Sequence, residues 1–394
     1  MASMEVVYCE KCVISNLRPT STKEGQHTKG ELKPTTRFLD GVCDACRWAI
    51  RKNTEVDWNK RERELQDLCD KHRKSDGNYD VIVPASGGKD SVYVAHLLKH
   101  KYKMNPLTVT WAPNIPTETG QLNQYNLVKS GFNNLLISPN GEIHRKLTAF
   151  AFKNLGHPFQ PFIFGQRSVG PKIALKYDVG LIFYGENVAE YGNNIEDNYS
   201  PIMDPELYTC YDTDDDKTKL GGMTIKELKS EYNFTRADLL PYKSPSMDDI
   251  IQNSLETHYM SYYRKWVPQE NFYYAVKNTF FEPAPVRSVG SYSKYSGVDD
   301  KLEWLHFYMM YIKFGMGRAT ADAAQEIRSG KINREEAVSL VNLYDGEFPQ
   351  DYLPDFLDYM SISEIDFFDI IDSFRAPHLW EKIGNDWKIK HTVS

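Results

Sequence analysis

The stretch Val81-Ile-Val-Pro-Ala-Ser-Gly-Gly-Lys-Asp-Ser91 decides the expected fold of this chain. Its apolar beginning is typical of a buried strand, its Gly-Gly pair of a tight turn, and the apolar spacing that follows of a helix. Glycines let a backbone approach an anion closely, and the N–H groups of the turn and of the helix N-terminus point at that anion. The stretch therefore predicts a phosphate-binding turn between a strand and a helix.

The spacing within this turn differs from that of the Walker loop, whose first glycine lies further from its Gly-Lys pair. It resembles instead the pyrophosphate loop of ATP pyrophosphatases, which split ATP into AMP and pyrophosphate. We therefore expect ATP as a ligand, and adenylylation rather than phosphoryl transfer. Phosphate contacts are expected from Ser86, Gly87, Gly88, Lys89 and Ser91, Mg²⁺ binding from Asp90, and catalytic roles for Lys89 and Asp90.

The chain beyond this turn alternates between apolar strands and helices. Apolar strands separated by helices predict an α/β fold with a parallel sheet covered on both faces. Ligands of such sheets bind outside the carboxyl ends of the strands. Strands are expected at 106–111, 134–138 and 179–184, helices at 121–129, 142–155 and 167–177, and ligand-facing loops at 86–91, 112–120 and 185–194.

Two of these strand ends carry further candidate residues. Trp111 ends the second strand, where it either flanks an adenine or packs in the core. Gly185-Glu186-Asn187 follows a buried strand and either brings a carboxylate and an amide to the ligand or forms a solvated loop. We expect Gly185 and Glu186 near the nucleotide and Asn187 near a second substrate.

The N-terminal region contains two Cys-x-x-Cys pairs, Cys9-Glu-Lys-Cys12 and Cys43-Asp-Ala-Cys46. Two such knuckles complete a four-sulfur site, which predicts a structural Zn²⁺, with an iron–sulfur cluster or a redox role as alternatives. The polar insert from Thr20 to Thr36 would loop out. The remaining cysteines, Cys69 and Cys210, are expected to be ordinary small apolar residues.

The last third of the chain predicts a helical domain, because the strand pattern stops near residue 240. Helices are expected from 299 to 314, after the capping box that opens at Asn333, and after Ser363. Arg318, between two glycines and a helix, either binds an anion or lies on a helix–helix turn. Arg287 and Lys294 are further candidates for a sugar-nucleotide pocket. The expected domains are a zinc knuckle at 1–56, a linker helix at 57–77, the ATP pyrophosphatase domain at 78–240 and the helical domain at 241–394.

The composition limits the classes of ligand and compartment. The chain has 394 residues, 41% of them hydrophobic, and a net charge of −7 without a long basic stretch. This balance argues against nucleic acid as the main ligand. No apolar segment long enough to span a bilayer and no signal peptide is expected, so the predicted location is cytoplasmic, without membrane association. The acidic run Asp212–Asp216 is expected to be a solvated loop rather than a cation site.

Taken together, the motifs resemble those of bacterial N-acetyl sugar amidotransferases, which have an adenine nucleotide α-hydrolase-like domain. The resemblance implies that ATP adenylylates the oxygen of an acetamido group on a nucleotide-activated sugar, and that ammonia then replaces AMP to leave an acetamidino group. These products belong to O-antigen lipopolysaccharide or to nonulosonic acids. The matching motifs are Tyr8–Cys12, Val83–Ser91, Val109–Ala112, Gly185–Asn187, Phe314–Thr320, Ile327–Lys331, Arg334–Glu336 and Tyr344–Gly346.

The resemblance also predicts partners. The chain begins Met1-Ala2-Ser3 and has no cysteine in a glycine-flanked elbow, so we expect no built-in glutaminase. Ammonia would come from a separate glutaminase subunit, through a barrel subunit similar to the histidine-pathway cyclase. The sugar is left open, as a UDP-linked diacetamido uronic acid or a nonulosonic acid with a CMP carrier.

Two alternatives remain. A tRNA-modifying, thiolation-type ATP pyrophosphatase also combines this loop with Cys-x-x-Cys pairs, but would need a basic face and a reactive Cys69 or Cys210. A zinc-ribbon scaffold with a vestigial nucleotide fold would not need the Lys89-Asp90 pair.

Overall fold

The computed structural model of the chain describes residues 5–17, 36–192, 194–205 and 218–394. The predicted insert through residue 35, Cys210 and the acidic run 212–216 lie outside these residues. Among the residues that the structure describes, no helix combines the length and the apolar character needed to cross a bilayer.

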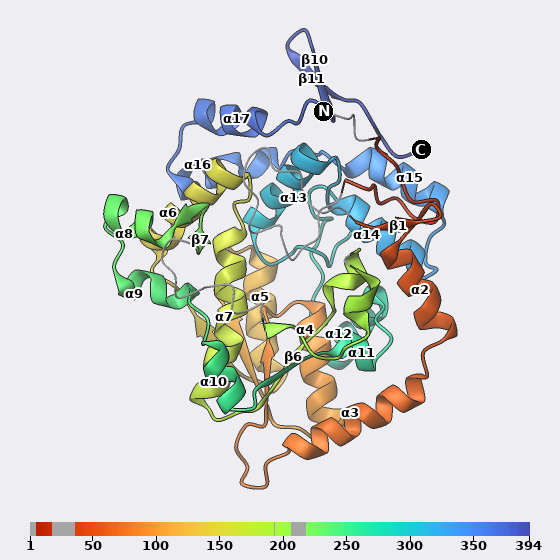
Figure 1. The fold of residues 1–394 in the computed structure, drawn as a ribbon, viewed down its shortest axis with the longest axis vertical. Helices are drawn as coiled ribbons and strands as arrows, with labels where there is room; N and C mark the ends of the chain where they lie inside the picture. The colour runs from red at the N-terminus through yellow and green to blue at the C-terminus, as the bar shows by residue number, and fades with distance from the viewer. Residues whose placement is uncertain (1–4, 18–35, 193, 206–217) are drawn as a thin grey trace.

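The centre of the fold is a parallel sheet of five strands, in the order β5-β4-β3-β6-β9 (Figure 1). The chain adds β4 and β5 on one side of β3, and then β6 and β9 on the other side. The sheet therefore reverses its strand order between β3 and β6, and a crevice at that switch point is where such sheets bind ligands. The strands are β3 (Val81–Pro84), β4 (Pro106–Trp111), β5 (Asn133–Ile137), β6 (Leu181–Tyr184) and β9 (Glu256–Tyr259).

The predicted α/β class and the parallel sheet are confirmed, but the strand pattern does not stop near residue 240. The fifth strand, β9, pairs with β6 from Leu181↔Glu256 to Tyr184↔Tyr259. Its sequence, Glu-Thr-His-Tyr, carries no apolar run, so hydrophobicity gave no signal for it. The polar residues are accommodated by side-chain contacts, as where His258 Nδ1 lies 2.7 Å from Tyr263 Oη.

Alternate residues of the strands supply two separate hydrophobic cores, one on each face of the sheet. Ile82 and Ile182 face α7 (Gln160–Lys176), in a cluster that also holds residues of α6 (Gly141–Leu155). Val83 and Phe183 belong to the opposite cluster, with α4 (Lys89–His96) and α12 (Pro268–Asn278). Both faces are covered, which explains the nearly continuous apolar sequence of the central strands.

The remaining elements around the sheet agree broadly with the expected helices. Asp57 caps the predicted linker helix by accepting hydrogen bonds from the backbone N–H groups of Asn59 and Lys60. The elements are β1 (Phe38–Leu39), β2 (Val42–Cys43), α2 (Asp44–Thr54), α3 (Trp58–His72), η1 (Leu97–Lys101), α5 (Glu118–Lys129), η2 (Val188–Tyr191), η3 (Ile195–Asn198), β7 (Lys219–Leu220), β8 (Met223–Thr224), α8 (Ile225–Tyr232), α9 (Arg236–Leu239), η5 (Leu240–Tyr242), α10 (Met247–Gln252) and α11 (Met260–Tyr263).

The C-terminal region is mostly helical, as predicted. The capping box between Asn333 and Glu336 is present, and Ser363 caps its helix through Asp366 N–H. A β-hairpin near the C-terminus, β10–β11, was not expected. The elements are α13 (Lys301–Phe314), α14 (Arg318–Arg328), α15 (Arg334–Tyr344), η6 (Gln350–Tyr352), α16 (Leu353–Met360), α17 (Glu364–Ser373), β10 (Trp380–Ile383) and β11 (Asp386–Ile389).

The N-terminal cysteine region packs against this helical region rather than standing apart from it. The four cysteines share one buried cluster with Ala323 and Ala324 of α14 and with Val341 of α15. Figure 1 shows α2 and β1 beside α14 and α15, at the edge of the molecule. On its other side, the cysteine region contacts η2, which follows β6, through the ion pair between Lys52 of α2 and Glu190.

Candidate active site

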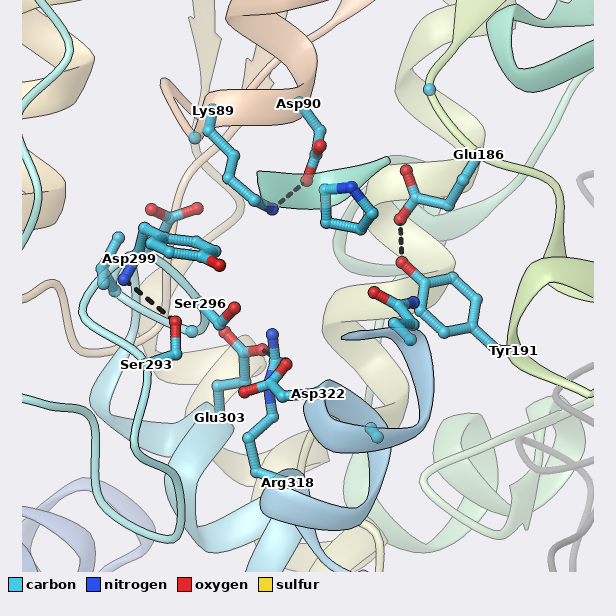
Figure 2. A pocket seen from close by; sticks show the side chains of 18 of the residues that line it. Lys89, Asp90, Glu186, Tyr191, Ser293, Ser296, Asp299, Glu303, Arg318 and Asp322 are labelled. Atoms are coloured by element: carbon cyan, nitrogen blue, oxygen red, sulfur yellow. Dashed lines mark hydrogen bonds and ion pairs between the residues drawn. The ribbon is translucent and has the colours of Figure 1, made fainter. Parts of the chain in front are cut away.

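A cavity of about 540 Å³ lies at the carboxyl ends of β3 and β6, where the strand order reverses. The loop at residues 86–91, which the sequence predicts to be a pyrophosphate loop, and the loop after β6 line one side of it. Residues from the segment before α13, from α13 and from α14 line the other. The cavity therefore joins the sheet to the C-terminal helices. Side chains labelled in Figure 2 that line it are Lys89, Asp90, Glu186, Tyr191, Ser293, Ser296, Asp299, Glu303, Arg318 and Asp322.

The loop at residues 86–91 forms the tight turn that its glycines predict, and one of these glycines is also required by packing. Gly87 has a φ of 95°, and a Cβ there would lie 2.7 Å from the backbone carbonyl carbon of Asn123 in α5. Gly87 is therefore required by close packing against α5 as well as by the turn. Gly88 is the N-cap of α4 and offers no side-chain cap, so the first N–H groups of that helix are left for another acceptor.

Lys89 and Asp90 are the first two residues of α4. Lys89 is buried, and its Nζ forms an ion pair with Asp90 Oδ2. Asp90 Oδ1 accepts a hydrogen bond of 3.0 Å from Nδ2 of Asn271, which is also buried. Lys89 Nζ also lies 5.6 Å from the ring centroid of Tyr295. An anion bound in the cavity would compete with Asp90 for the ammonium group of Lys89.

Glu186 approaches the same place from the loop after β6. It accepts a hydrogen bond from the Tyr191 hydroxyl. Burial, and then the nearby charge of Asp90, raise the pKa of Glu186. Two carboxylates that repel each other in a cavity are a donor set that suits a hard divalent cation such as Mg²⁺.

The opposite end of the cavity is built around Arg318 at the start of α14. Its Nη1 lies 2.9 Å from Glu303 Oε1, and its Nε lies 3.2 Å from Asp322 Oδ1. Burial raises the pKa of Glu303 to about 7, although Arg318 opposes that shift. Figure 2 shows Arg318, Glu303 and Asp322 grouped across the cavity from Lys89 and Asp90. This end offers a polar ligand the positive charge of Arg318, the carboxylates of Glu303 and Asp322, and the hydroxyls of Ser293 and Ser296.

A second cavity of about 250 Å³ lies at the carboxyl end of β4. Ser86, Asp299 and Glu303 line both cavities, so the two adjoin beside the pyrophosphate loop. Three aromatic side chains line the second one: Trp111, Phe159 and Phe162.

Trp111 packs in the core, which is one of the two alternatives expected for it, and also borders a cavity. It is only 3% exposed and belongs to the core, and it also lines the second cavity. Gly165 of α7 makes room for the indole, because a Cβ there would lie 2.2 Å from the ring. Trp111 Nε1 is buried without a hydrogen-bond partner among the described residues.

The loop 112–120 contributes Pro113 and Gly120 to the second cavity. Asp300, the N-cap of α13, accepts hydrogen bonds from the backbone N–H groups of Asn114 and Ile115. Burial raises the pKa of Asp300 to about 6. The start of α13 thus fixes the loop that follows β4.

Several predicted site residues lie elsewhere. Arg287 forms an ion pair of 2.6 Å with Glu347 and lines neither cavity. Lys294 donates to the carbonyl of Pro285 at 2.9 Å and is exposed. Asn187 is buried, and its Nδ2 donates to the carbonyl of Asp197 at 2.7 Å. The structure therefore does not bring Arg287, Lys294 or Asn187 to the cavity, whereas Gly185, Glu186 and Arg318 all line it.

The four N-terminal cysteines form a compact cluster. Their sulfurs all lie within 4.8 Å of one another, and all four side chains are buried. Cys12 Sγ and Cys43 Sγ are 3.7 Å apart. A tetrahedral ion with Zn–S bonds of about 2.3 Å places its sulfurs roughly 3.8 Å apart, so the cluster fits a structural Zn²⁺. The N–H groups of Lys11 and Cys43 each lie 3.4 Å from Cys9 Sγ, as knuckle backbones donate to a thiolate.

Sequence reasoning missed part of the cavity wall. Asp299, Glu303 and Asp322 come from a region in which only Arg318 was singled out. Gln166 lines both cavities from the middle of α7. A helix was expected to begin at residue 299, and the acidic residues of its first turn were the one signal in the sequence for this part of the cavity wall. Acidic first turns also occur on helices that bind no ligand, so the signal was not specific.

Comparisons with known proteins agree with this picture for part of the chain. Residues 289–393 match the family described as "LPS biosynthesis protein WbpG-like, C-terminal domain". The motifs Phe314–Thr320, Ile327–Lys331 and Tyr344–Gly346 all fall within that match. It confirms the predicted family resemblance for the C-terminal region, which supplies the Arg318 end of the cavity.

A second similarity is local. The chain is 42% identical over 52 residues to the uncharacterised protein MJ1599 of Methanocaldococcus jannaschii, which is 13% of this chain and 19% of that protein. The chain therefore matches about a fifth of that relative's length, and the similarity carries no statement about activity.

Proposed function

We propose, from the premise that residues 289–393 are the C-terminal domain of a WbpG-like lipopolysaccharide biosynthesis protein, that the chain is an ATP-dependent N-acetyl sugar amidotransferase. It would convert the acetamido group of a nucleotide-activated sugar into an acetamidino group, for O-antigen or nonulosonic-acid glycans. One observation carries this proposal: the Lys89-Asp90 pair of the pyrophosphate loop and Arg318 of the family domain line the same cavity.

The two adjoining cavities suit the two parts of ATP. Adenosine would occupy the second cavity, where the aromatic side chains of Trp111, Phe159 and Phe162 offer flat apolar surface. Ser86 lines both cavities, so the triphosphate would pass from there toward α4. The uncapped N–H groups of α4 and the ammonium of Lys89 would hold the β- and γ-phosphates.

Asp90 and Glu186 are the residues that would hold Mg²⁺. The ion would supply positive charge to the phosphate oxygens. Asn271 orients Asp90 by donating to its Oδ1, at 3.0 Å. Lys89 would exchange its pairing with Asp90 for a phosphate oxygen, and it would stabilise the charge that develops on the leaving pyrophosphate.

The acceptor sugar would enter from the Arg318 end. Its amide oxygen attacks the α-phosphorus of ATP, the bond from that phosphorus to the bridging oxygen breaks, and pyrophosphate leaves with the electron pair. Ammonia then adds to the activated carbon, loses a proton, and AMP departs to leave the amidine. An amide carbon is a poor electrophile, so conversion of its oxygen into AMP supplies the leaving group that the exchange requires. Water competes with ammonia at this carbon, and a cavity closed in by the C-terminal helices limits that competition.

The source of ammonia is part of the same proposal. We infer a separate glutaminase subunit that delivers ammonia through a cyclase-like barrel subunit. Cys69 lies buried in α3, where burial raises the pKa of its thiol to about 12. A protonated thiol away from the cavity suits neither a glutaminase nucleophile nor the sulfur carrier of a thiolation enzyme.

The test is a direct assay of the product. The protein is incubated with ATP, Mg²⁺, ammonium and either a UDP-linked diacetamido uronic acid or a CMP-linked nonulosonic acid, and the sugar is analysed by mass spectrometry. Conversion of acetamido to acetamidino lowers the mass by the difference between O and NH, and one AMP is formed for each amidine. A matched incubation without ammonium gives no amidine. Release of ADP instead of AMP, or no mass change in any acetamido sugar, would contradict the proposal.

A further inference from the structure

We propose that Glu190 is a positioning residue that couples the four-cysteine cluster to the loop between Gly185 and Tyr191, and so to the nucleotide end of the cavity. The proposal concerns the chain's own contacts. Its consequence for ATP rests on the proposed function.

Glu190 is buried, at 7% exposure, and each oxygen of its carboxylate has a partner within the protein. Oε2 forms an ion pair of 2.7 Å with Nζ of Lys52, and Oε1 accepts a hydrogen bond of 2.8 Å from Trp48 Nε1. Lys52 is likewise buried, at 4% exposure. Two buried charges are tolerated only when they are paired and hydrogen-bonded, so this contact holds α2 and η2 in one arrangement.

The groups that hold Glu190 are themselves anchored at the cysteines. Trp48 and Lys52 lie on α2, which begins directly after Cys43 and contains Cys46. The backbone carbonyl of Glu190 accepts a hydrogen bond of 2.9 Å from Nη2 of Arg328, at the end of α14. Both α2 and α14 pack in the buried cluster that contains the four cysteines. An ion that draws the four sulfurs together therefore fixes the two helices between which Glu190 is held.

The next residue in the chain after Glu190 is Tyr191, which belongs to the cavity wall. Tyr191 lines the cavity and donates to Glu186, which lines it too. The beginning of the loop is held separately, because Ser261 N–H donates to the Gly185 carbonyl at 2.9 Å and Ser261 Oγ accepts from Asn187 N–H at 2.9 Å. The position of Tyr191, and through it that of Glu186, thus depends on the contacts of Glu190 with α2 and α14.

The first experiment measures backbone hydrogen exchange in the full chain. Glu190→Gln keeps the shape of the side chain but leaves Lys52 without its partner charge. We expect exchange in residues 185–192 to rise by about tenfold or more, because a loop that loses its buried anchor opens more often. The double variant Lys52→Met with Glu190→Gln removes both charges, so it keeps the test interpretable if the single variant folds poorly.

The second experiment removes the metal. Chelation of the wild-type protein should raise exchange in residues 185–192 as well as in 36–54, and should add little in the double variant, in which the link is already broken. The control is Glu256→Gln, which disrupts a carboxylate that pairs with Lys71 at the amino end of β9, whereas the cavity lies at the carboxyl ends of the strands. That control should leave exchange in 185–192 unchanged.

ATP affinity gives an independent readout. A misplacement of about 1 Å at a catalytic constellation can cost on the order of 10²-fold in rate, so Glu190→Gln should lower turnover and weaken ATP binding by tenfold or more. Unchanged exchange in 185–192 after either Glu190→Gln or chelation would overturn the coupling. Raised exchange in a protein that binds no ATP even as wild type would leave the coupling standing and contradict the proposed function instead.

Discussion

The pyrophosphate-loop end of the cavity and its Arg318 end differ in how the chain builds them. At the first end, Ser86, Lys89 and Asp90 come from one contiguous motif whose geometry follows from a strand, a turn and a helix. At the second end, Glu303 comes from α13 and Arg318 from α14, and they meet only because those helices pack together. Under the proposed function, the first end would activate ATP and the second would select the acceptor.

The largest effect should come from the pyrophosphate-loop end. Asp90→Ala should lower pyrophosphate release by about 10³-fold, because it removes a carboxylate that would hold Mg²⁺ at the phosphates. The fold should persist, because Asp90 lies on the rim of the cavity and not in either core. A coupled pyrophosphate assay, together with circular dichroism, checks both statements. Undiminished turnover would contradict the role of this end in activation.

The next effect concerns Arg318. Arg318→Lys keeps the charge but loses the planar fork that reaches both Glu303 and Asp322. We expect the KM for the acceptor sugar to rise by roughly 10-fold to 100-fold, the cost of one or two charge-assisted hydrogen bonds, while the KM for ATP stays within about twofold. Steady-state kinetics with each substrate varied in turn separates the two. An equal rise in both KM values would break the proposed division.

A smaller, pH-dependent effect is expected at Glu303, where burial raises the pKa to about 7. The unfolded chain releases this proton at lower pH than the folded protein does. Stability therefore falls as the pH rises from about 4.5 to about 7, and the folded protein keeps its full advantage only below that window. Glu303→Gln should remove this dependence, so its stability relative to wild type should improve between pH 5 and pH 8 by up to about 3 kcal/mol.

Denaturant unfolding of both proteins at the two pH values measures this difference. A difference in stability that stays constant with pH would mean that the carboxyl of Glu303 titrates normally.

The smallest effect is expected outside the cavity. Arg287 pairs with Glu347 at a partly exposed position, where ion pairs contribute about 0–1 kcal/mol. Arg287→Ala should therefore leave the KM for the acceptor within about twofold of the wild-type value, in contrast to Arg318→Lys. A large rise in that KM would show that the Arg318 end extends further than the cavity that we describe.

The same contrast explains what could be predicted from the sequence. The strand, turn and helix around Lys89 were predicted because each depends on the local conformation of consecutive residues. The same holds for the cysteine knuckles, whose four sulfurs are found together. By comparison, β9 was missed because its polar residues carry no hydrophobic pattern, and its place in the sheet comes from pairing with β6.

The candidate site residues also divide into those that a local motif could predict and those that only helix packing placed. Arg287, Lys294 and Arg318 were candidates of the same kind, basic residues near glycines, and only Arg318 lines the cavity. Nothing in the spacing of these residues indicates which one points inward, because that direction depends on how α13 and α14 pack.

The sequence by itself determined the α/β class, the phosphate-binding turn and the four-cysteine cluster, since short motifs specify backbone geometry over a few consecutive residues. Only the tertiary structure decided that Trp111 is both a core residue and a cavity wall, and that Glu303 and Arg318 lie opposite Lys89. It also decided that Glu190 connects the cysteine cluster to the loop after β6. The physical reason is that contacts between residues far apart in the chain arise from the packing of whole cores, to which every buried side chain contributes.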